Sequence, residues 1–467
     1  MKQSRLAALA LLLALGCQTD RPDRRSPPEP TEQHRTALDT STAAPASGPV
    51  SGAGALAAPE SPRAPLVPLT RPKEPLSVIV LSVEAWRADM PWSGYTRAIT
   101  PSLSQLAAES SVWENHRSVS SHGPQALAAM LSGRYPSSLY RSGAALATFG
   151  SDDLFLPEAL QKRGIRTLGV QADAYFDKGR GFEQGFDVWE VVPGAGAGQA
   201  AHSAADQLAA RLVELLAQPQ NTGQQFFAWA HFMDPSEPYV SHPGLPELGK
   251  QPRDRYDAEL LFTDQAIGKV LEFARRQAWW GRTAVVVTGD HGAAFGEHGP
   301  AKPAGDLWDV LLQTPLLIHA PGAKPARIAA ARSQIDLAPT VLELMGLPRE
   351  AEFLGQSLLP ELYGAAAAPR PVLLFELCED SENPGLRAVV VGDDKLIVPT
   401  AGGDERLFNL KADPRELENL AESKVGKLQA LAVRFEREWI RIPSIEPSGG
   451  VKLYSGRLAQ GPEHRKH

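Results

Sequence analysis

Two stretches of the chain end in side chains that can bind a metal ion. In one, residues 283–299 read TAVVVTGDHGAAFGEHG, and Asp290 and His291 directly follow an apolar run. In the other, the apolar run VIVLSV at residues 78–83 ends at Glu84. Carboxylates together with one imidazole suit a divalent cation such as Mg, Ca, Mn or Zn. We therefore predict that Glu84, Asp290 and His291 bind a divalent metal, since such groups are costly to bury unpaired.

The elements that must position these side chains are buried parallel strands. Short β-branched runs without polar alternation, such as residues 284–287 and 78–83, suit central strands covered on both faces. In open α/β sheets, ligands bind beyond the carboxyl ends of such strands. Two parallel strands would therefore bring Glu84 close to Asp290 and His291. A lone Asp-His pair is more often a turn cap beside a locally packed ring, so the prediction depends on the second strand.

Length and charge narrow the class of protein. A chain of 467 residues can form one large α/β domain with a smaller one appended. The net charge is −7 and there is no basic block, so nothing favours nucleic acid as a partner. The two cysteines are Cys17 and Cys378, so no intrachain disulfide can form if Cys17 is acylated.

The N-terminus has the pattern of a secretory signal. Lys2 and Arg5 accompany an apolar run over residues 6–15, which is too short to span a bilayer. The run ends in the sequence ALGC, which resembles a bacterial lipobox and predicts an acylated Cys17. The alternative is cleavage elsewhere, with Cys17 incidental. Gln18 in the next position favours retention at the outer membrane.

These signals predict how the N-terminal part is used. We expect residues 1–17 to be a lipoprotein signal peptide and the protein to be lipid-anchored in the bacterial cell envelope. Residues 18–75 are rich in Pro, Ala and Ser, and such a segment buries too little apolar surface to offset its ordering entropy. They are predicted to be a disordered tether, and the anchor is then the only expected contact with the membrane.

Patterns along the rest of the chain predict further helices and strands. Thr100 and Pro101 favour a helix start, with Thr100 as its N-cap. Further helices are expected where apolar residues recur at helical spacing, at 204–216, 256–274 and 428–440. Strands are expected at 225–231, 315–318, 372–377, 387–391, 395–398 and 407–410, with a hairpin turn at 402–404.

A series of motifs gives a family resemblance. The motifs, in chain order, are SVIVLSVEAWRAD, ITPSLSQLAAES, LSGRYP, HFMDPSEPY, TGDHGAAFGEHG, TPLLIHAPG, IDLAPTVLELMGLP, GQSLLPEL and LFNLKADPRELENLAE. Together they span about residues 76–422 and resemble the sulfatase family of the alkaline-phosphatase superfamily. The resemblance implies an α/β fold with a mostly parallel sheet flanked by helices, at 76–345. A small antiparallel subdomain would follow at 346–442. Separately, the Gly- and Lys-rich composition of residues 443–467 predicts a mobile tail.

The resemblance also implies a mechanism. Family members hold a divalent cation at two strand ends, beside a nucleophile at a helix N-terminus. That nucleophile is a modified Cys or Ser in sulfatases, and Thr in relatives that transfer phosphoglycerol or phosphoethanolamine. Glu84 stands where Asp is usual, and Glu is what the transferase branch uses. Asp290 and His291 match the second ligand pair.

The nucleophile position departs from the family motif. Counting back from Gly133 puts it at Gly123, whereas aligning on Pro124 puts it at His122. Neither reading gives Cys, Ser or Thr. The nearest hydroxyl groups belong to Ser121 and the serine before it, and Leu127 replaces the arginine of the motif.

Two further contacts to the ester are altered. Ser236 stands where the family has His, and Pro303 replaces a second His, although Lys302 beside it could supply the charge. His231 and His298 do match. The candidate catalytic residues are therefore Ser121, His122, His231 and Lys302. The alternatives are structural, with Ser121 in a turn, His122 as a helix cap and Lys302 as a solvated surface charge.

Three functions remain open from the sequence. One is metal-dependent hydrolysis of a sulfuric or phosphoric ester, with Ser121 or a metal-bound water as the nucleophile. Another is a catalytically inactive, sulfatase-like binding protein. The third is a phosphoryl transferase acting on envelope lipids or glycans. The expected partner in the first two is a small-molecule or glycan sulfate or phosphate ester, whose identity the sequence does not reveal.

Overall fold

An eight-stranded sheet organises the described part of the chain. The computed structural model describes residues 72, 74–193, 204–299, 305–368, 370–447 and 450–453. The strand order is β4-β3-β5-β1-β6-β7-β2-β8, and every neighbouring pair is parallel except the two that involve β7. The strands are β1 (Ser77–Val83), β2 (Ser111–Arg117), β3 (Arg166–Gln171), β4 (Val188–Val191), β5 (Phe226–Phe232), β6 (Thr283–Gly289), β7 (Leu316–His319) and β8 (Ala326–Ser333).

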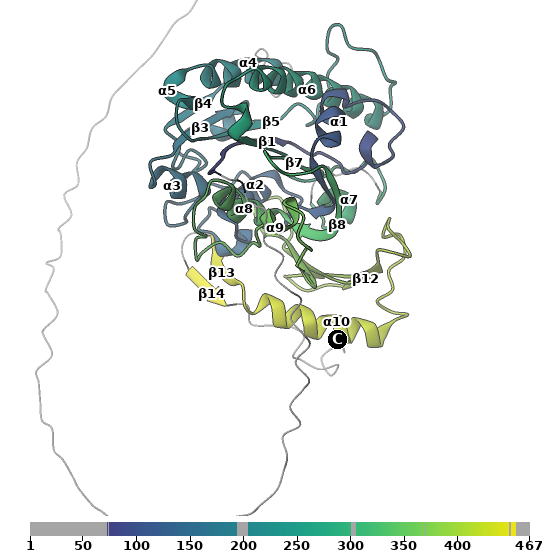
Figure 1. Cartoon of the computed structure of the whole chain (residues 1–467). Helices are drawn as coiled ribbons and strands as arrows, with labels where there is room; N and C mark the ends of the chain where they lie inside the picture. The colour runs from purple at the N-terminus through teal and green to yellow at the C-terminus, as the bar shows by residue number, and fades with distance from the viewer. Residues whose placement is uncertain are drawn as a thin grey trace, which may run out of the picture. The chain divides into compact units, whose positions relative to one another are not determined.

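Helices cover both faces of this sheet (Figure 1). Alternate residues of β1 show the division: Val78 and Val80 pack against α2, α3 and α8, while Ile79 and Leu81 pack against α1, α4 and α6. The helices are α1 (Pro101–Ala108), α2 (Gly123–Ser132), α3 (Leu156–Gln161), α4 (Ala205–Leu216), α5 (Pro219–Thr222), α6 (Pro252–Arg275), α7 (Asp309–Leu312), α8 (Leu337–Leu344), α9 (Leu359–Leu362) and α10 (Val425–Trp439).

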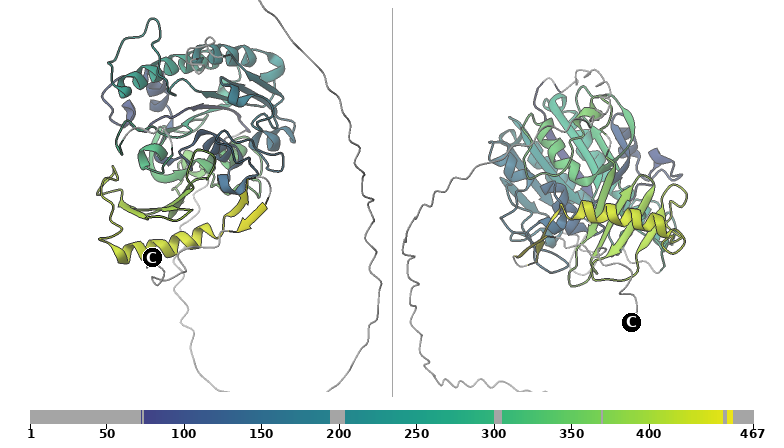
Figure 2. Two further views of the ribbon diagram at one scale, coloured as in Figure 1. Left: turned by 180° about the vertical axis from the view of Figure 1, so that it is seen from behind. Right: turned by 90° about the horizontal axis from the view of Figure 1, so that it is seen from below.

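A four-stranded antiparallel sheet follows, in the order β12-β11-β10-β9. Its strands are β9 (Val372–Leu377), β10 (Leu386–Val391), β11 (Asp394–Pro399) and β12 (Arg406–Asn409). One face packs on α10 through Phe435 and Trp439, and the other packs on Leu307 and Leu312. Figure 2 shows α10 lying across this sheet. The predicted fold, a mostly parallel sheet with an antiparallel C-terminal subdomain, is thus confirmed.

The segment predicted as a mobile tail, residues 443–467, begins with two short strands in the described ranges. Strands β13 (Pro443–Glu446) and β14 (Gly450–Leu453) pair as an antiparallel hairpin. Ile445 is buried, and its carbonyl oxygen accepts a hydrogen bond from Arg141 Nη1 at 3.1 Å. These contacts tie Pro443–Glu446 to the main domain, which its local sequence did not suggest.

Helix α1 begins at Pro101, as predicted, but Thr100 does not cap it with its side chain. Instead, the Asp264 carboxylate on α6 accepts hydrogen bonds from the backbone N–H groups of Ser102 and Leu103, at 2.9 and 2.8 Å. A carboxylate there satisfies two free donors and complements the helix dipole. The cap thus comes from a distant segment, which local sequence cannot reveal.

Several predictions concern residues outside the described ranges. These are the signal peptide, the acylated Cys17, the tether and Lys302. In the described ranges, no helix combines the length and the apolar character that a membrane span requires.

Candidate cation centre and ester cavity

The ends of β1 and β6 bring the predicted metal ligands together. The two strands are parallel neighbours, and Val83 pairs with Gly289. Glu84 and Asp290 therefore leave the sheet side by side. One ligand atom from each of Glu84, Asp290 and His291 lies within 4.8 Å of the others. The juxtaposition predicted from the sequence is present.

Hydrogen bonds orient Asp290 and His291. Asp290 Oδ1 accepts from the backbone N–H groups of Ala85 and His291, at 2.9 and 2.6 Å. Its Oδ2 is buried and has no hydrogen-bond partner among the described residues. His291 Nδ1 lies 2.6 Å from the Gly292 carbonyl oxygen, so Nδ1 carries a proton and Nε2 faces Glu84 Oε1 at 3.3 Å. Asp290 Oδ2 and His291 Nε2 thus both lie on the side of the cluster that faces Glu84.

Without a cation, the cluster offsets its negative charge only by binding protons. Burial raises the pKa of Asp290, and the Glu84 carboxylate raises it further. Burial would also raise the pKa of Glu84, but hydrogen bonds from His231 and His291 outweigh it, and this pKa is lowered. Burial opposes protonation of His291, yet both carboxylates raise its pKa to about 10. A divalent cation would replace that proton, so two carboxylates, one imidazole and the unpaired Oδ2 fit a cation.

Gly123 lies directly against this cluster. A Cβ atom built on Gly123 would lie 3.2 Å from Asp290 Oδ2 and 3.3 Å from Glu84 Oε2. Gly123 is the first residue of α2, where backbone amides and the helix dipole favour an anion. The geometry thus favours the alignment counted back from Gly133, and the position that faces the cluster has no side chain.

His122 and Ser121 occupy different surroundings. His122 is the N-cap residue of α2, but its side chain makes no capping hydrogen bond. Its ring lines the cavity above the cluster, its Nδ1 is buried without a partner among the described residues, and burial lowers its pKa. The Ser121 hydroxyl is also buried and unpartnered in the described structure, but Ser121 does not line that cavity. The structure therefore brings His122, and not Ser121, to the cavity wall.

His231, at the end of β5, is engaged through both ring nitrogens. Nδ1 lies 2.9 Å from Ser82 Oγ, which also accepts a hydrogen bond from Trp229 Nε1 at 2.9 Å. Nε2 lies 3.2 Å from Glu84 Oε2. The ring packs edge-on to Phe176, with centroids 5.7 Å apart. His231 lines the cavity and fixes the Glu84 carboxylate.

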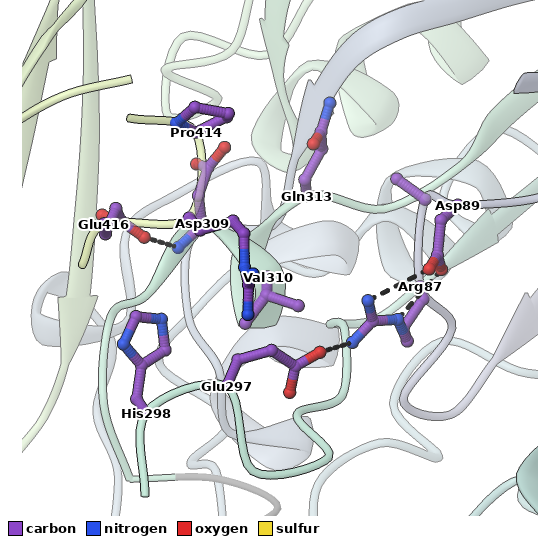
Figure 3. Close-up of a pocket in the computed structure, with 11 residues that line it drawn as sticks. Arg87, Asp89, Glu297, His298, Asp309, Val310, Gln313, Pro414 and Glu416 are labelled. Atoms are coloured by element: carbon purple, nitrogen blue, oxygen red, sulfur yellow. Dashed lines mark hydrogen bonds and ion pairs between the residues drawn. The ribbon is translucent and has the colours of Figure 1, made fainter. Parts of the chain in front are cut away.

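His298 belongs to a neighbouring pocket. Its ring stacks on Trp308 at a centroid distance of 3.9 Å. The pocket has a volume of about 260 Å³ and includes Arg87, whose guanidinium pairs with Glu297 at 2.7 Å (Figure 3). His298 does not line the cavity above the cation cluster. The sequence match at this position thus does not bring the ring to the site.

That cavity has a volume of about 350 Å³. Glu84, His291 and Gly123 are among its lining residues. The described walls combine apolar and acidic side chains, among them Leu127, Leu146, Tyr175, Phe176, Met233, Tyr239, Asp173 and Glu237. The arrangement can hold the anionic end of an ester against a cation and place the remainder between apolar walls.

Sequence reasoning missed the residues that hold this site from behind. Gln334 Nε2 donates to the Asp290 carbonyl oxygen at 3.0 Å, and Gln334 Oε1 accepts from Ser118 Oγ at 2.9 Å. On α2, Gln125 Oε1 accepts from the backbone N–H of Cys378 at 2.9 Å, and Gln125 Nε2 donates to its carbonyl at 3.3 Å. Isolated glutamines in a sequence carry no signal for such contacts.

The turn after Glu84 is also fixed from a distance. Ala85 has a left-handed backbone, with φ at +50°. The Tyr256 hydroxyl on α6 donates to the Ala85 carbonyl at 2.8 Å and accepts from the backbone N–H of Arg87 at 3.0 Å. This conformation is strained for alanine, and the long helix holds it in place.

Family models match most of the described chain. The model "Sulfatase" matches residues 75–347, which is more than half of the chain. The chain belongs to the sulfatase family. A second model, "N-sulphoglucosamine sulphohydrolase, C-terminal", matches residues 304–438 of this sulfatase-family chain.

Curated relatives are similar over part of their length. A choline-sulfatase of Rhizobium meliloti is 31% identical over 186 residues, which cover 38% of this chain and 34% of the relative. Arylsulfatase K of Danio rerio is 30% identical over 200 residues, 41% of this chain and 38% of the relative. The matches thus span little more than a third of these relatives.

Solved structures support the fold. A protein in complex with its substrate D-glucosamine-2-N,6-O-disulfate superposes with a TM-score of 0.67 at 17% identity, covering 78% of this chain and 97% of that one. The phosphonate monoester hydrolase of Silicibacter pomeroyi gives a TM-score of 0.65 at 19% identity, covering 82% and 100%. At these identities the likeness concerns the fold.

Proposed function

We propose that this sulfatase-family protein is a cation-dependent hydrolase of sulfate, phosphate or phosphonate monoesters that uses water as the attacking group. The observation that carries the proposal is Gly123, which faces the carboxylates of Glu84 and Asp290 where a nucleophilic side chain would stand. A covalent route through this position is closed, while the space beside the carboxylates is open to a small molecule.

The residues of the chain have distinct roles in this proposal. Glu84, Asp290 and His291 would hold a divalent cation, which polarises the ester oxygens and lowers the pKa of water. His231 keeps Glu84 in position through its Nε2 contact of 3.2 Å. His122 is neutral at pH 7 because burial lowers its pKa, and its ring lines the cavity, so the imidazole can accept a proton from water.

The ester class draws on the relatives. One curated relative is named a choline-sulfatase, and a structural neighbour is named a phosphonate monoester hydrolase. Both names concern monoesters of tetrahedral oxyanions. We extend that class to this chain, with sulfate and phosphonate monoesters as the first substrates to test.

A second candidate is a binding protein without turnover. Gly123 favours it too, because a site that has lost its nucleophile can still hold a cation and an anion. Leu127, in place of the motif's arginine, removes a further charge near the ester. The two candidates share the cation site and differ in whether bonds break.

The test is turnover of 4-nitrophenyl sulfate and a 4-nitrophenyl phosphonate by the full chain, with Mn²⁺ or Ca²⁺ and with chelator. Cation-dependent release of nitrophenol, lost in Glu84→Ala/Asp290→Ala and kept in Ser121→Ala, supports the proposal. Loss of turnover in a folded Ser121→Ala variant would identify Ser121 as the nucleophile instead. Absence of turnover together with stoichiometric cation binding supports the binding protein.

Stereochemistry at phosphorus separates the routes further. A chiral phosphonothioate monoester hydrolysed in H₂¹⁸O would give the labelled product with inversion if water attacks directly, and with retention if a covalent intermediate forms. His122→Gln should lower kcat on the same substrate at least tenfold and leave cation affinity unchanged.

The proposal also includes a location. Acylation at Cys17 would hold the protein at the bacterial cell envelope, by the outer membrane. Cys17→Ala should release the protein from the membrane fraction, and continued sedimentation with membranes would argue against the anchor.

A further inference from the structure

We propose that the cavity selects esters whose leaving group is an uncharged aryl or alkyl group rather than an anionic sugar. This inference rests on the proposed function only in that the anionic end of the ester lies at the cation cluster. It names the part of the substrate that the rest of the cavity contacts.

The first argument is the apolar wall that continues from the cation cluster. Leu127 lies one helical turn after Gly123 on α2, so both residues share a face of the helix. Leu127, Phe176 and Met233 line the same cavity as Glu84. A leaving group attached to an ester at the cluster would therefore meet hydrocarbon first, and burying an apolar group there is favourable.

The wall is formed before any ligand arrives. Phe176 is buried and packs edge-on to Trp229, with centroids 6.1 Å apart. Tyr175 donates its hydroxyl to the Ala147 carbonyl oxygen at 2.9 Å. With that hydroxyl bound to the backbone, Tyr175 has only its ring to offer the cavity. A rigid aromatic wall favours a flat or compact apolar group, because little side-chain entropy is lost on binding.

The second argument is charge. Asp173 and Glu237 line the cavity, and its described lining includes no Lys or Arg. An anionic substituent on a leaving group that lay beside these carboxylates would meet like charge. A sulfated or carboxylated sugar is therefore disfavoured, although its reacting ester could still reach the cation.

The third argument is Leu146, which is 50% exposed and lines the cavity. Two hydrogen bonds of 2.9 Å hold its loop. The Ser142 backbone N–H donates to the Thr148 carbonyl oxygen, and the Thr148 backbone N–H donates to the Ser142 hydroxyl oxygen. A leucine fixed and exposed beside a cavity gains stability when an apolar ligand covers it.

The experiment measures binding by calorimetry in the Mn²⁺-loaded full chain, with phenylphosphonate and methylphosphonate as probes. Both carry the same anion, so their affinity ratio reports the apolar wall. We expect phenylphosphonate to bind at least tenfold more tightly. A disulfated glucosamine should bind more weakly than phenylphosphonate. Equal affinity for the two phosphonates, or tighter binding of the disulfated sugar, would overturn the inference.

A matched pair of variants locates the preference. Leu146→Ser should reduce the phenyl-to-methyl affinity ratio at least threefold, because it removes apolar surface that only the phenyl group can cover. Leu354→Ser is the control, because Leu354 is 44% exposed and does not line the cavity. An unchanged ratio in Leu146→Ser, or an equal loss in both variants, contradicts the inference.

The two proposals fail in different ways. A phenyl preference without turnover of any ester would contradict the proposed hydrolase function and support the inferred preference for apolar leaving groups. Turnover without a phenyl preference would support the hydrolase function and contradict the inferred preference for apolar leaving groups. If neither phosphonate binds, the anion site is wrong, and binding of 4-nitrophenol alone then decides whether the apolar wall selects a ring.

Discussion

Two clusters of buried charged residues in this protein differ in how their charges are paired. The first lies where the C-terminal sheet meets the main sheet and joins Arg117, Asp309, Lys395 and Glu416. Arg117 binds the Asp309 carboxylate through two hydrogen bonds of 2.7 and 2.9 Å, and Lys395 Nζ lies 2.7 Å from Glu416 Oε1. Each charge in this cluster faces an opposite charge.

The second cluster, Glu84, Asp290 and His291, is not balanced in this way. It buries two carboxylates beside one imidazole, and Asp290 Oδ2 accepts no hydrogen bond in the described structure and lies 3.8 Å from His291 Nε2. The comparison shows that similar buried charges can either stabilise a fold or prepare a site. Internal pairing makes the first cluster structural, whereas the missing positive charge makes the second receptive to a cation.

The largest expected effect comes from breaking the paired cluster. Asp309→Ala leaves Arg117 and Lys395 buried without their shared carboxylate, which should cost about 3–5 kcal/mol of unfolding free energy. Urea denaturation measures it. The control is Asp306→Ala, whose ion pair with Arg406 is partly exposed and should contribute less than about 1 kcal/mol. Similar losses of unfolding free energy in both variants would show that the buried cluster is no more stabilising than the partly exposed pair.

Another buried carboxylate, Asp234, tests how much folding stability an unpaired buried charge costs when no cation binds it. Its Oδ1 accepts from the Ala205 backbone N–H at 3.1 Å, its Oδ2 has no partner among the described residues, and burial raises its pKa to about 7. Since the folded pKa exceeds the unfolded value of about 3.9, its stabilising contribution holds below pH 4 and is lost as pH rises through 7.

Asp234→Asn should remove that dependence, because the amide oxygen still accepts from Ala205 and no charge forms. Thermal unfolding with chelator, from pH 4 to pH 8, should show the variant gaining on the wild type as pH rises. The gain at pH 8 is at most about 4 kcal/mol, at 1.36 kcal/mol for each pKa unit. A difference that stays constant across this range would contradict the assignment.

The unbalanced cluster should respond to a cation. At about 100 times the Kd, a bound cation adds about 2.7 kcal/mol of stability, so Mn²⁺ should raise the Tm of the wild type. Asp290→Asn should abolish that rise, while its metal-free form is as stable as the wild type or more so, because one of two neighbouring carboxylates is gone. His298→Asn, in the adjacent pocket, should keep the rise. A Tm rise in Asp290→Asn would show that the cation binds elsewhere.

A residue with a left-handed backbone lies in or beside each cluster: Glu416, with φ at +54°, belongs to the first, and Ala85, with φ at +50°, follows Glu84 of the second. Glycine adopts this conformation without strain, so Ala85→Gly should stabilise the metal-free protein by up to about 1 kcal/mol. Ala88→Gly is the matched control and should destabilise slightly, because its φ is not positive. Destabilisation of similar size in both variants would argue that Ala85 is not strained. Calorimetric unfolding measures both.

The sequence predicted correctly the strands that are uniformly apolar and the polar side chains that directly follow them. Strands β1 and β6 are uninterrupted apolar runs, and their ends identified Glu84, Asp290 and His291. Strand β8, with sequence ARIAAARS, was missed because much of it is exposed and its small and charged residues do not alternate clearly. Strand β2 was missed for a similar reason, since polar residues interrupt it in SVWENHR.

The fine structure of the site could not be predicted, because it depends on contacts between distant residues. Counting along the chain left Gly123 and His122 as equal readings, and only the proximity of Gly123 to two carboxylates separates them. Gln125 and Gln334 contact residues 253 and 44 positions away. No periodicity or motif encodes such pairings.

The tie between Gln125 and Cys378 has a consequence for how the chain acquires its site. Closing a contact over 253 residues costs loop entropy early in folding, so helix α2 gains this support only after the C-terminal sheet has formed. A nascent chain that ends before β9 would present both carboxylates beside a helix that lacks this contact. Glu84, Asp290 and His291 all precede β9, so a cation could bind to the chain before helix α2 gains its support from the C-terminal sheet.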